Sequence, residues 1–380
     1  METIVYLFPF FTAVILLLFF RKETVWWEYL LLILPSLLLI FCVEFIMKKT
    51  NVSDTEYLGY YVEKISHYDR WNEYIHRTCT RQVPCGTDSK GHTKYRTETY
   101  DCSYVENHPE RWTYTLNDGS ENYFYNEAEF NMVKERLNAK MQFVDMHRHY
   151  YTIDGDKQDY VWDARREHIF TMTKEHSYDN PVKSSHSIFK YDDISEKRAK
   201  NMGLYDYPEI KNYDQNAIIG WPVDKADQDA VRYVNGVLGK KHQFRMYILI
   251  YPDKGVSVVD KQRSYWKGSN KNELIVCIGY DTTKRKIKWC ECFSWADEPI
   301  LEVRTKGYFI EKDSLDIQGY CNYIFPIVKN QWVRKSFSDF EYLKIELSDT
   351  QVSWLFTIML IYNIFMSFYI IKNEYKRRDE

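Results

Sequence analysis

The chain has 380 residues, a formal net charge of −3, and nearly equal numbers of basic and acidic residues, at 51 and 54. This balance excludes a basic nucleic-acid-binding domain, because such a domain concentrates positive charge against phosphate. Tyrosine is frequent, with 33 residues, and there are 11 tryptophans. Aromatic residues are enriched at interfaces and in binding clefts, although an AT-rich genome produces the same compositional bias.

Three apolar segments predict transmembrane helices. Residues 3–20 and 25–47 lie at the N-terminus, and residues 352–371 lie near the C-terminus. A helix rises about 1.5 Å per residue, so roughly 20 apolar residues cross a bilayer core. The first segment lacks a basic start and a small-residue cleavage site, which favours a retained helix over a signal peptide. Asn363 lies near the centre of the third segment, where we expect it to bond another helix.

Basic residues beside the spans predict the orientation of the chain, because they are enriched on the cytoplasmic side. Arg21 and Lys22 link the first two segments, which form the predicted membrane hairpin of residues 1–49. A basic tail occupies residues 372–380. Placing both the link and the tail in the cytoplasm leaves the large soluble region outside it, against the weaker opposing signal of Lys48 and Lys49. We therefore expect an integral protein of the lipid bilayer with an extracytoplasmic soluble region.

The first soluble part, residues 50–175, is predicted to be β-rich. Runs of aromatic and β-branched residues predict strands at 58–67, 72–83, 93–105, 111–116, 122–125, 141–153 and 158–163. Asn117-Asp118-Gly119-Ser120 predicts a hairpin turn. A short helix is expected at 127–139, with Asn126 as its N-cap and Glu129 three residues later.

The second soluble part follows a polar stretch, residues 176–222, which we expect to be a linker or irregular segment with a helix at 192–202. Residues 223–345 predict an α/β domain. Its expected helices and strands are 224–238, 244–251, 260–267, 273–280, 287–295 and a helix near 312–327. The fold class predicted for the whole chain is α+β, with helices covering a small sheet.

A first polar cluster consists of His76, Cys79, Cys85, His92, Cys102 and His108. A turn centred on Lys90 and Gly91 would pair position 79 with position 102, so a cross-strand disulfide is expected where the geometry allows it. Buried free thiols are an alternative. Zinc is another, but the irregular spacing lacks the CxxC pattern that zinc sites usually use. Seven cysteines in the soluble region leave at least one unpaired in a monomer.

A second cluster contains His147 and His149. Residues i and i+2 of a strand face the same side, so these two imidazoles are candidates to hold a metal together, with zinc as the possible ion. A solvated strand face is the alternative.

A third cluster contains Cys277, Cys290 and Cys292, with Cys277 expected near Cys290 across a hairpin. Apolar neighbours favour buried thiols or one cross-strand disulfide over redox chemistry.

The loop at 265–273 contains Gly268, Ser269 and Asn270, whose backbone N–H groups are candidates to bind an anion. An ordinary solvated connection is the alternative. Around this loop, residues 215–295 resemble the TPM domain: a helix, a buried strand, a Trp-x-Gly loop, then a hairpin. The resemblance implies a membrane-associated α/β domain, and some members are credited with phosphatase activity. Glu273 stands where that family usually has glycine, and no catalytic residue carries over.

Residues 60–115 are similar to segments of uncharacterised phage and bacterial membrane proteins, which implies no activity. Because no catalytic signature is present, the sequence favours a non-enzymatic, membrane-anchored extracytoplasmic binding or assembly protein. We expect it to form a homo-oligomer or to bind a membrane-protein partner. One alternative is a metal-dependent or TPM-like envelope hydrolase that uses His147, His149 and the 265–273 loop. Another is a subunit of a multi-protein membrane complex.

Overall fold

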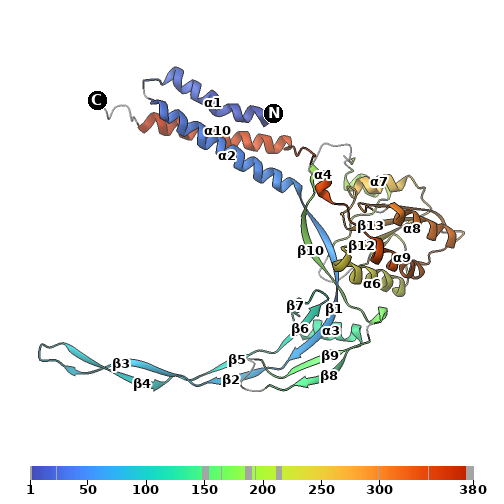
Figure 1. The fold of residues 1–380 in the computed structure, drawn as a ribbon, viewed down its shortest axis with the longest axis horizontal. Helices are drawn as coiled ribbons and strands as arrows, with labels where there is room; N and C mark the ends of the chain where they lie inside the picture. Colours follow the sequence, from blue (N-terminus) through green and yellow to red (C-terminus); the bar gives the residue numbers. More distant parts are fainter. Residues whose placement is uncertain are drawn as a thin grey trace.

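The computed structural model confirms an α+β chain with several sheets. The residues that it describes are 2–22, 24–147, 154–163, 165–184, 191–192, 194–210, 216–297, 299–340 and 342–373. Figure 1 shows three parts: a bundle of apolar helices, a β-rich part that ends in a long arm, and an α/β part beside them.

The apolar bundle contains α1 (Glu2–Phe19), α2 (Trp26–Val52) and α10 (Asp349–Asn373), which pack side by side (Figure 1). Two of the described helices, α2 and α10, are long enough and apolar enough to cross a membrane. Helix α1 is equally apolar but shorter, so the third span stays a prediction.

Two buried polar side chains of the bundle bond within their own helices. The buried Asn363 amide donates to the Met359 carbonyl at 2.8 Å. Ser36 donates to the Leu32 carbonyl in the same way. This i to i−4 bond satisfies one donor of Asn363, whereas its buried Oδ1 has no hydrogen-bond partner among the described residues, so the expected bond to another helix stays a prediction.

The β-rich part is built on β1 (Ser53–Tyr68), which begins directly after α2. Its sheet runs β7-β6-β1-β9-β8, and β10 pairs with the first half of β1. The remaining strands are β6 (Arg111–Leu116), β7 (Glu121–Tyr123), β8 (Lys140–Asp145), β9 (Lys157–Val161) and β10 (Thr171–Asp179). The predicted strand at 141–153 ends at Asp145, and residues 148–153 lie outside the described residues.

Helix α3 (Glu127–Leu137) covers this sheet and buries Phe130 and Val133. Its predicted cap is confirmed: Asn126 accepts from the Glu129 amide at 2.9 Å, and the Glu129 carboxylate accepts from the Tyr125 amide at 2.7 Å. The N-cap therefore marks the start of the helix in the sequence.

Two strands predicted in the first soluble part are each broken in two. Residues 72–83 and 93–105 become β2 (Trp71–Ile75), β3 (Thr78–Thr87), β4 (Thr93–Asp101) and β5 (Tyr104–His108). Strand β2 pairs with β5, and β3 pairs with β4, as two antiparallel ribbons in succession. We call residues 71–108 the arm.

The α/β part contains a four-stranded sheet in the order β11-β12-β13-β14. Strands β11 (Ile218–Ile219), β12 (Arg245–Pro252) and β13 (Glu273–Asp281) are parallel, and β14 (Lys286–Ser294) closes an antiparallel hairpin as predicted. Every residue of β13 is buried, which explains its unbroken apolar sequence.

Helices α6 (Lys225–His242), α7 (Val258–Tyr265), α8 (Pro299–Lys312) and α9 (Ile317–Gln331) surround this sheet. The helix expected near 312–327 is α9, which Asp316 caps, and α8 precedes it where no helix was expected. Helix α6 also continues past Gly239, where its end was expected, to His242.

The predicted linker at 176–222 is partly structured. Strand β10 continues to Asp179, and two short helices follow, α4 (Pro181–Ser184) and α5 (Glu196–Met202). The Tyr205 backbone bonds both polar atoms of the fully buried Gln262 side chain at 2.9 Å. The described residues around Tyr205 therefore pack against the α/β core, and this backbone pairing was not visible in the polar sequence.

Strand β1 and α6 approach each other closely at glycines. A Cβ on Gly59 would lie 2.2 Å from the Asn235 carbonyl oxygen, and one on Gly239 would lie 2.4 Å from the Gly59 oxygen. Only glycine, which has no Cβ, allows the two backbones to approach this closely. The contact joins the β-rich part to the α/β part.

We predict that Gly59→Ala destabilises the chain by about 1–3 kcal/mol, because the new methyl group overlaps backbone atoms that cannot move independently. Gly255→Ala is the matched control, since a Cβ there meets nothing within 4 Å. Thermal unfolding of the detergent-solubilised chain should show a lower melting temperature for Gly59→Ala only. Equal melting temperatures for the two variants would contradict the close packing.

Candidate functional site

The arm is the most exposed structural feature of the chain. It extends from the β-rich part as a two-stranded ribbon (Figure 1). In this fully described stretch, no residue from 71 to 108 belongs to a hydrophobic cluster of the protein. Other forces must therefore hold the ribbon together.

A pair of cysteines joins the two strands of the arm. The sulfur atoms of Cys79 and Cys102 lie at disulfide distance, with their Cα atoms 5.8 Å apart. The expected partners are therefore correct. Because the two sulfurs pair with each other, the structure gives no support to a zinc site built from both thiolates. Cys85 is free and exposed, and the His76 ring packs on Tyr74 at 4.5 Å.

The predicted register of this pair is wrong by two residues. Cys79 lies opposite Tyr100, and Cys102 donates its amide to the Arg77 carbonyl at 2.9 Å, so the disulfide crosses the ribbon diagonally. The turn is larger than Lys90 and Gly91 alone: the Asp88 carboxylate accepts from the amides of Lys90 and His92, both at 2.8 Å. The pairing of β3 with β4 is also irregular between Pro84 and Thr87, and this irregularity accounts for the rest of the two-residue difference in register.

A row of acidic, imidazole and indole side chains occupies one face at the base of the arm. We call it the ladder face, and its members are His67, Asp69, Trp71, Glu73, Glu106, His108, Glu110 and Trp112. They alternate along two strands, so the period of two places them on one side. Cross-strand partners are His67 with Trp112, Trp71 with His108, and Glu73 with Glu106.

Stacked rings fix the imidazoles of the ladder face. His67 and Trp112 are nearly parallel at 5.6 Å, and Trp71 and His108 at 5.0 Å. The His147 ring packs against Trp71 at 4.0 Å. Stacking of this kind limits ring rotation and holds each imidazole nitrogen toward the neighbouring carboxylates.

Two groups on the ladder face have the residue types and spacing of metal ligands. In the first, His67 Nε2 lies 2.6 Å from Glu110 Oε1, and Asp69 lies on the Nδ1 side. In the second, His108 Nε2 lies 3.1 Å from Glu73 Oε2, with Glu106 alongside. The ligand atoms within each group all lie within 4.8 Å of one another.

The sequence analysis missed the ladder face, although one signal was available. His67, Asp69, Trp71 and Glu73 occur at every second position, which is the period of a strand face. Their partners lie about 40 residues later in the chain, and only the strand register reveals that the two rows meet. No local motif contains both rows.

His147 does not lie on a strand, as the predicted pair with His149 requires. Strand β8 ends at Asp145, so His147 lies in the following turn, where its amide donates to Asp156 at 2.5 Å. His147 is in neither potential metal group found among the described residues. His149 lies outside those residues.

The predicted anion-binding loop holds a carboxylate of the chain itself. Ser269 Oγ and the Asn270 amide donate to Glu273 Oε2, and Asn270 Nδ2 donates to Oε1. Glu273 is fully buried. Tyr207 also donates to Glu273, and burial together with this carboxylate raises the pKa of Tyr207 well above its ordinary value. The anion position of Gly268, Ser269 and Asn270 is therefore occupied by the chain's own Glu273 carboxylate.

The cysteines of the β13–β14 hairpin are buried free thiols. Cys290 lies opposite Ile278, whereas Cys277 lies opposite Glu291, so Cys277 faces the other side of the sheet from Cys290. Cys277 is therefore beside Cys290 in the hairpin, as expected, but on the opposite face, where the two cannot form a cross-strand pair. Burial raises the pKa of the Cys277 and Cys292 thiols, which disfavours reactive thiolates.

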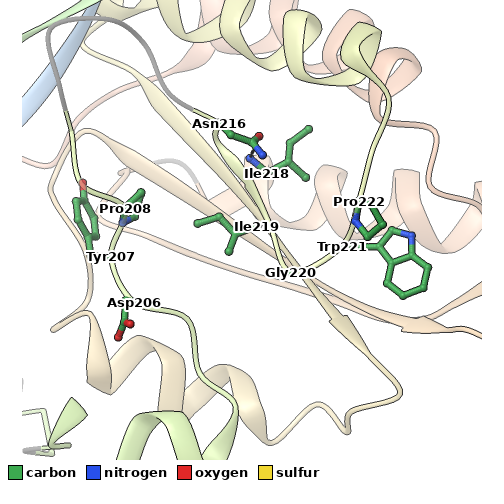
Figure 2. A pocket seen from close by; sticks show the side chains of 9 residues that line it. All are labelled: Asp206, Tyr207, Pro208, Asn216, Ile218, Ile219, Gly220, Trp221 and Pro222. Atoms are coloured by element: carbon green, nitrogen blue, oxygen red, sulfur yellow. Dashed lines mark hydrogen bonds between the residues drawn. The ribbon is translucent and has the colours of Figure 1, made fainter. Parts of the chain in front are cut away.

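A hollow of about 580 Å³ lies at the open edge of the small sheet beside β11. Figure 2 shows its lining side chains, which include Asp206, Tyr207, Ile219 and Trp221. Asp206 already accepts a hydrogen bond from Tyr265 at 2.6 Å. The hollow has one carboxylate and mainly apolar walls, so it offers few groups for acid–base or metal chemistry. The ladder face and the arm are therefore the candidate site.

Comparisons with protein-family models, with curated proteins and with solved structures found no match. The function is therefore argued from the geometry of the site.

We predict that the double substitution Cys79→Ala with Cys102→Ala increases amide exchange in β3 and β4 without changing exchange in β13. A disulfide that closes a loop of this size contributes about 3 kcal/mol, and the arm has no core contacts to replace it. Hydrogen exchange with mass spectrometry measures both regions at once. Cys85→Ala serves as the control, and unchanged exchange in the double variant would contradict a stabilising role for the disulfide.

Proposed function

We propose that this chain is a membrane-anchored binding protein whose arm contacts a protein partner outside the cytoplasm. In this proposal α1, α2 and α10 are the three membrane spans. The observation that carries it is the arm itself: a long, disulfide-joined ribbon that contributes nothing to the hydrophobic core. A two-stranded ribbon in water is only marginally stable. A protein that keeps such a ribbon is expected to use it in contact with another molecule.

The exposed side chains of the arm suit a protein interface. Tyr74, Tyr95, Tyr100 and Tyr104 are all exposed. Arg81 lies over the Tyr100 ring at 5.4 Å and pairs with Glu98 at 3.3 Å. Tyrosine and arginine dominate the binding energy of many protein interfaces, because they combine apolar area with directed hydrogen bonds.

The disulfide supports the extracytoplasmic side of this proposal. Disulfides persist in oxidising compartments and are rare in the cytosol. The four thiols of the α/β part are protected by burial, which is compatible with the same compartment. The basic residues Arg21 and Lys22 support the cytoplasmic side for the hairpin link.

Site-specific photo-crosslinking tests the partner contact. A photoreactive amino acid at Tyr95 in the arm should give adducts in cells that naturally make the protein. The same residue at Tyr125 is the control, because Tyr125 is more exposed, at 91% against 62%, but lies outside the arm. An adduct at twice the 46.0 kDa chain mass would identify a second copy as the partner. Equal adduct yields from the two positions, or none from Tyr95, would refute arm-mediated binding.

Labelling of Cys85 tests the orientation separately. Cys85 is free and exposed on the arm, so a membrane-impermeant maleimide should label it in intact cells. Cys85→Ser should abolish that label, because the other free thiols of the soluble region are buried. A tag after Glu380 should be protected until the cells are permeabilised. Labelling of Cys85 only after permeabilisation would reverse the orientation.

A further inference from the structure

We propose that Glu73, Glu106 and His108 form a binding site for a divalent transition metal that clamps β2 to β5 at the base of the arm. This site goes beyond the proposed binding function and does not depend on it. It uses three side chains of the ladder face that come from two strands.

The charge arrangement is the first argument. Glu73 lies directly opposite Glu106 in the antiparallel ribbon, and like charges in such a pair destabilise a sheet. Among the described residues, neither glutamate has a lysine or arginine at ion-pair distance, and the only ion-pair partner of Glu73 is His108. By contrast, the nearby Asp159 carboxylate is neutralised by a lysine, because it pairs with Lys64 at 3.1 Å.

The geometry is the second argument. His108 Nε2 and Glu73 Oε2 are 3.1 Å apart, close to the separation of about 3.3 Å between two ligand atoms that share a tetrahedral zinc. The Glu106 carboxylate lies within 4.8 Å of both atoms. Glu106 is exposed, so rotation of its side chain can bring an oxygen into the third position.

The surroundings hold the site in place. Trp71 stacks on His108 and keeps the ring aligned with the glutamates, and the His108 side chain is only 12% exposed. An orienting contact of this kind supports metal ligands, because a fixed ring loses less rotational freedom on binding.

The donor set selects the class of metal. One imidazole and two carboxylates suit Zn²⁺, Mn²⁺ or Co²⁺ better than Ca²⁺ or Mg²⁺, which prefer oxygen ligands alone. The neighbouring group of His67, Asp69 and Glu110 is less suited, because Gln158 already bonds both His67 and Asp69. We therefore assign one site rather than two.

The test uses the full chain in detergent, stripped with a chelator and titrated with Co²⁺. The wild type should bind about one equivalent with visible d–d absorption, and Zn²⁺ should displace it. Glu106→Gln should weaken binding by about tenfold or more. Zn²⁺ should also slow amide exchange at 71–75 and 104–108 in the wild type, and Glu106→Gln should abolish this effect.

Two further variants separate a ligand role from a folding defect. Glu98→Gln makes the same chemical change on the same arm, at a carboxylate paired with Arg81, and should bind Co²⁺ like the wild type. Glu106→His supplies another metal ligand and should retain binding. Absence of saturable binding in the wild type would overturn the proposal. So would unchanged affinity in Glu106→Gln, or equal losses in Glu98→Gln and Glu106→Gln.

Discussion

The buried carboxylate of Glu56 ties the parts of this protein together. Arg334 Nη2 donates to both of its oxygens, at 2.9 and 2.8 Å, and His176 Nδ1 lies 2.8 Å away. Glu56 belongs to β1, and Arg334 follows α9 in the α/β part. Removing one partner of a buried pair leaves an uncompensated charge, so this contact fixes where β1 lies against the α/β part. The glycine contact between Gly59 and α6 lies three residues further along the same strand.

This constraint at β1 governs where the arm begins. Strand β1 continues from α2 without a loop, pairs with β10, and then enters the larger sheet beside β6 and β9. The chain leaves that sheet at Tyr68 and returns at Arg111, so both strands of the arm are anchored to paired neighbours of the same sheet. The base of the arm, where the ladder face lies, is therefore held by the sheet on both of its strands.

Local chemistry in the sequence predicted much of the fold. The N-cap at Asn126, the hairpin of β13 and β14, and the pairing of Cys79 with Cys102 all depend on residues close in sequence or on one turn. The errors arose at a strand irregularity, at a loop that the chain's own carboxylate fills, and where two strands distant in sequence meet. The strand irregularity near Pro84 shifted the arm register, and Glu273 filled the anion position of its own loop. The ladder face required the register of β2 against β5.

Three separate devices hold the arm along its length. The turn is closed by Asp88, the middle is crossed by the Cys79–Cys102 pair, and the base brings Glu73 and Glu106 face to face. The first two need nothing from outside the chain, whereas the third is repulsive unless a cation neutralises it. A ribbon that is rigid before it meets a partner loses less conformational entropy on binding. The repulsive base is thus the point at which an added ion changes the stiffness of the arm, while the disulfide keeps its strands paired in either state.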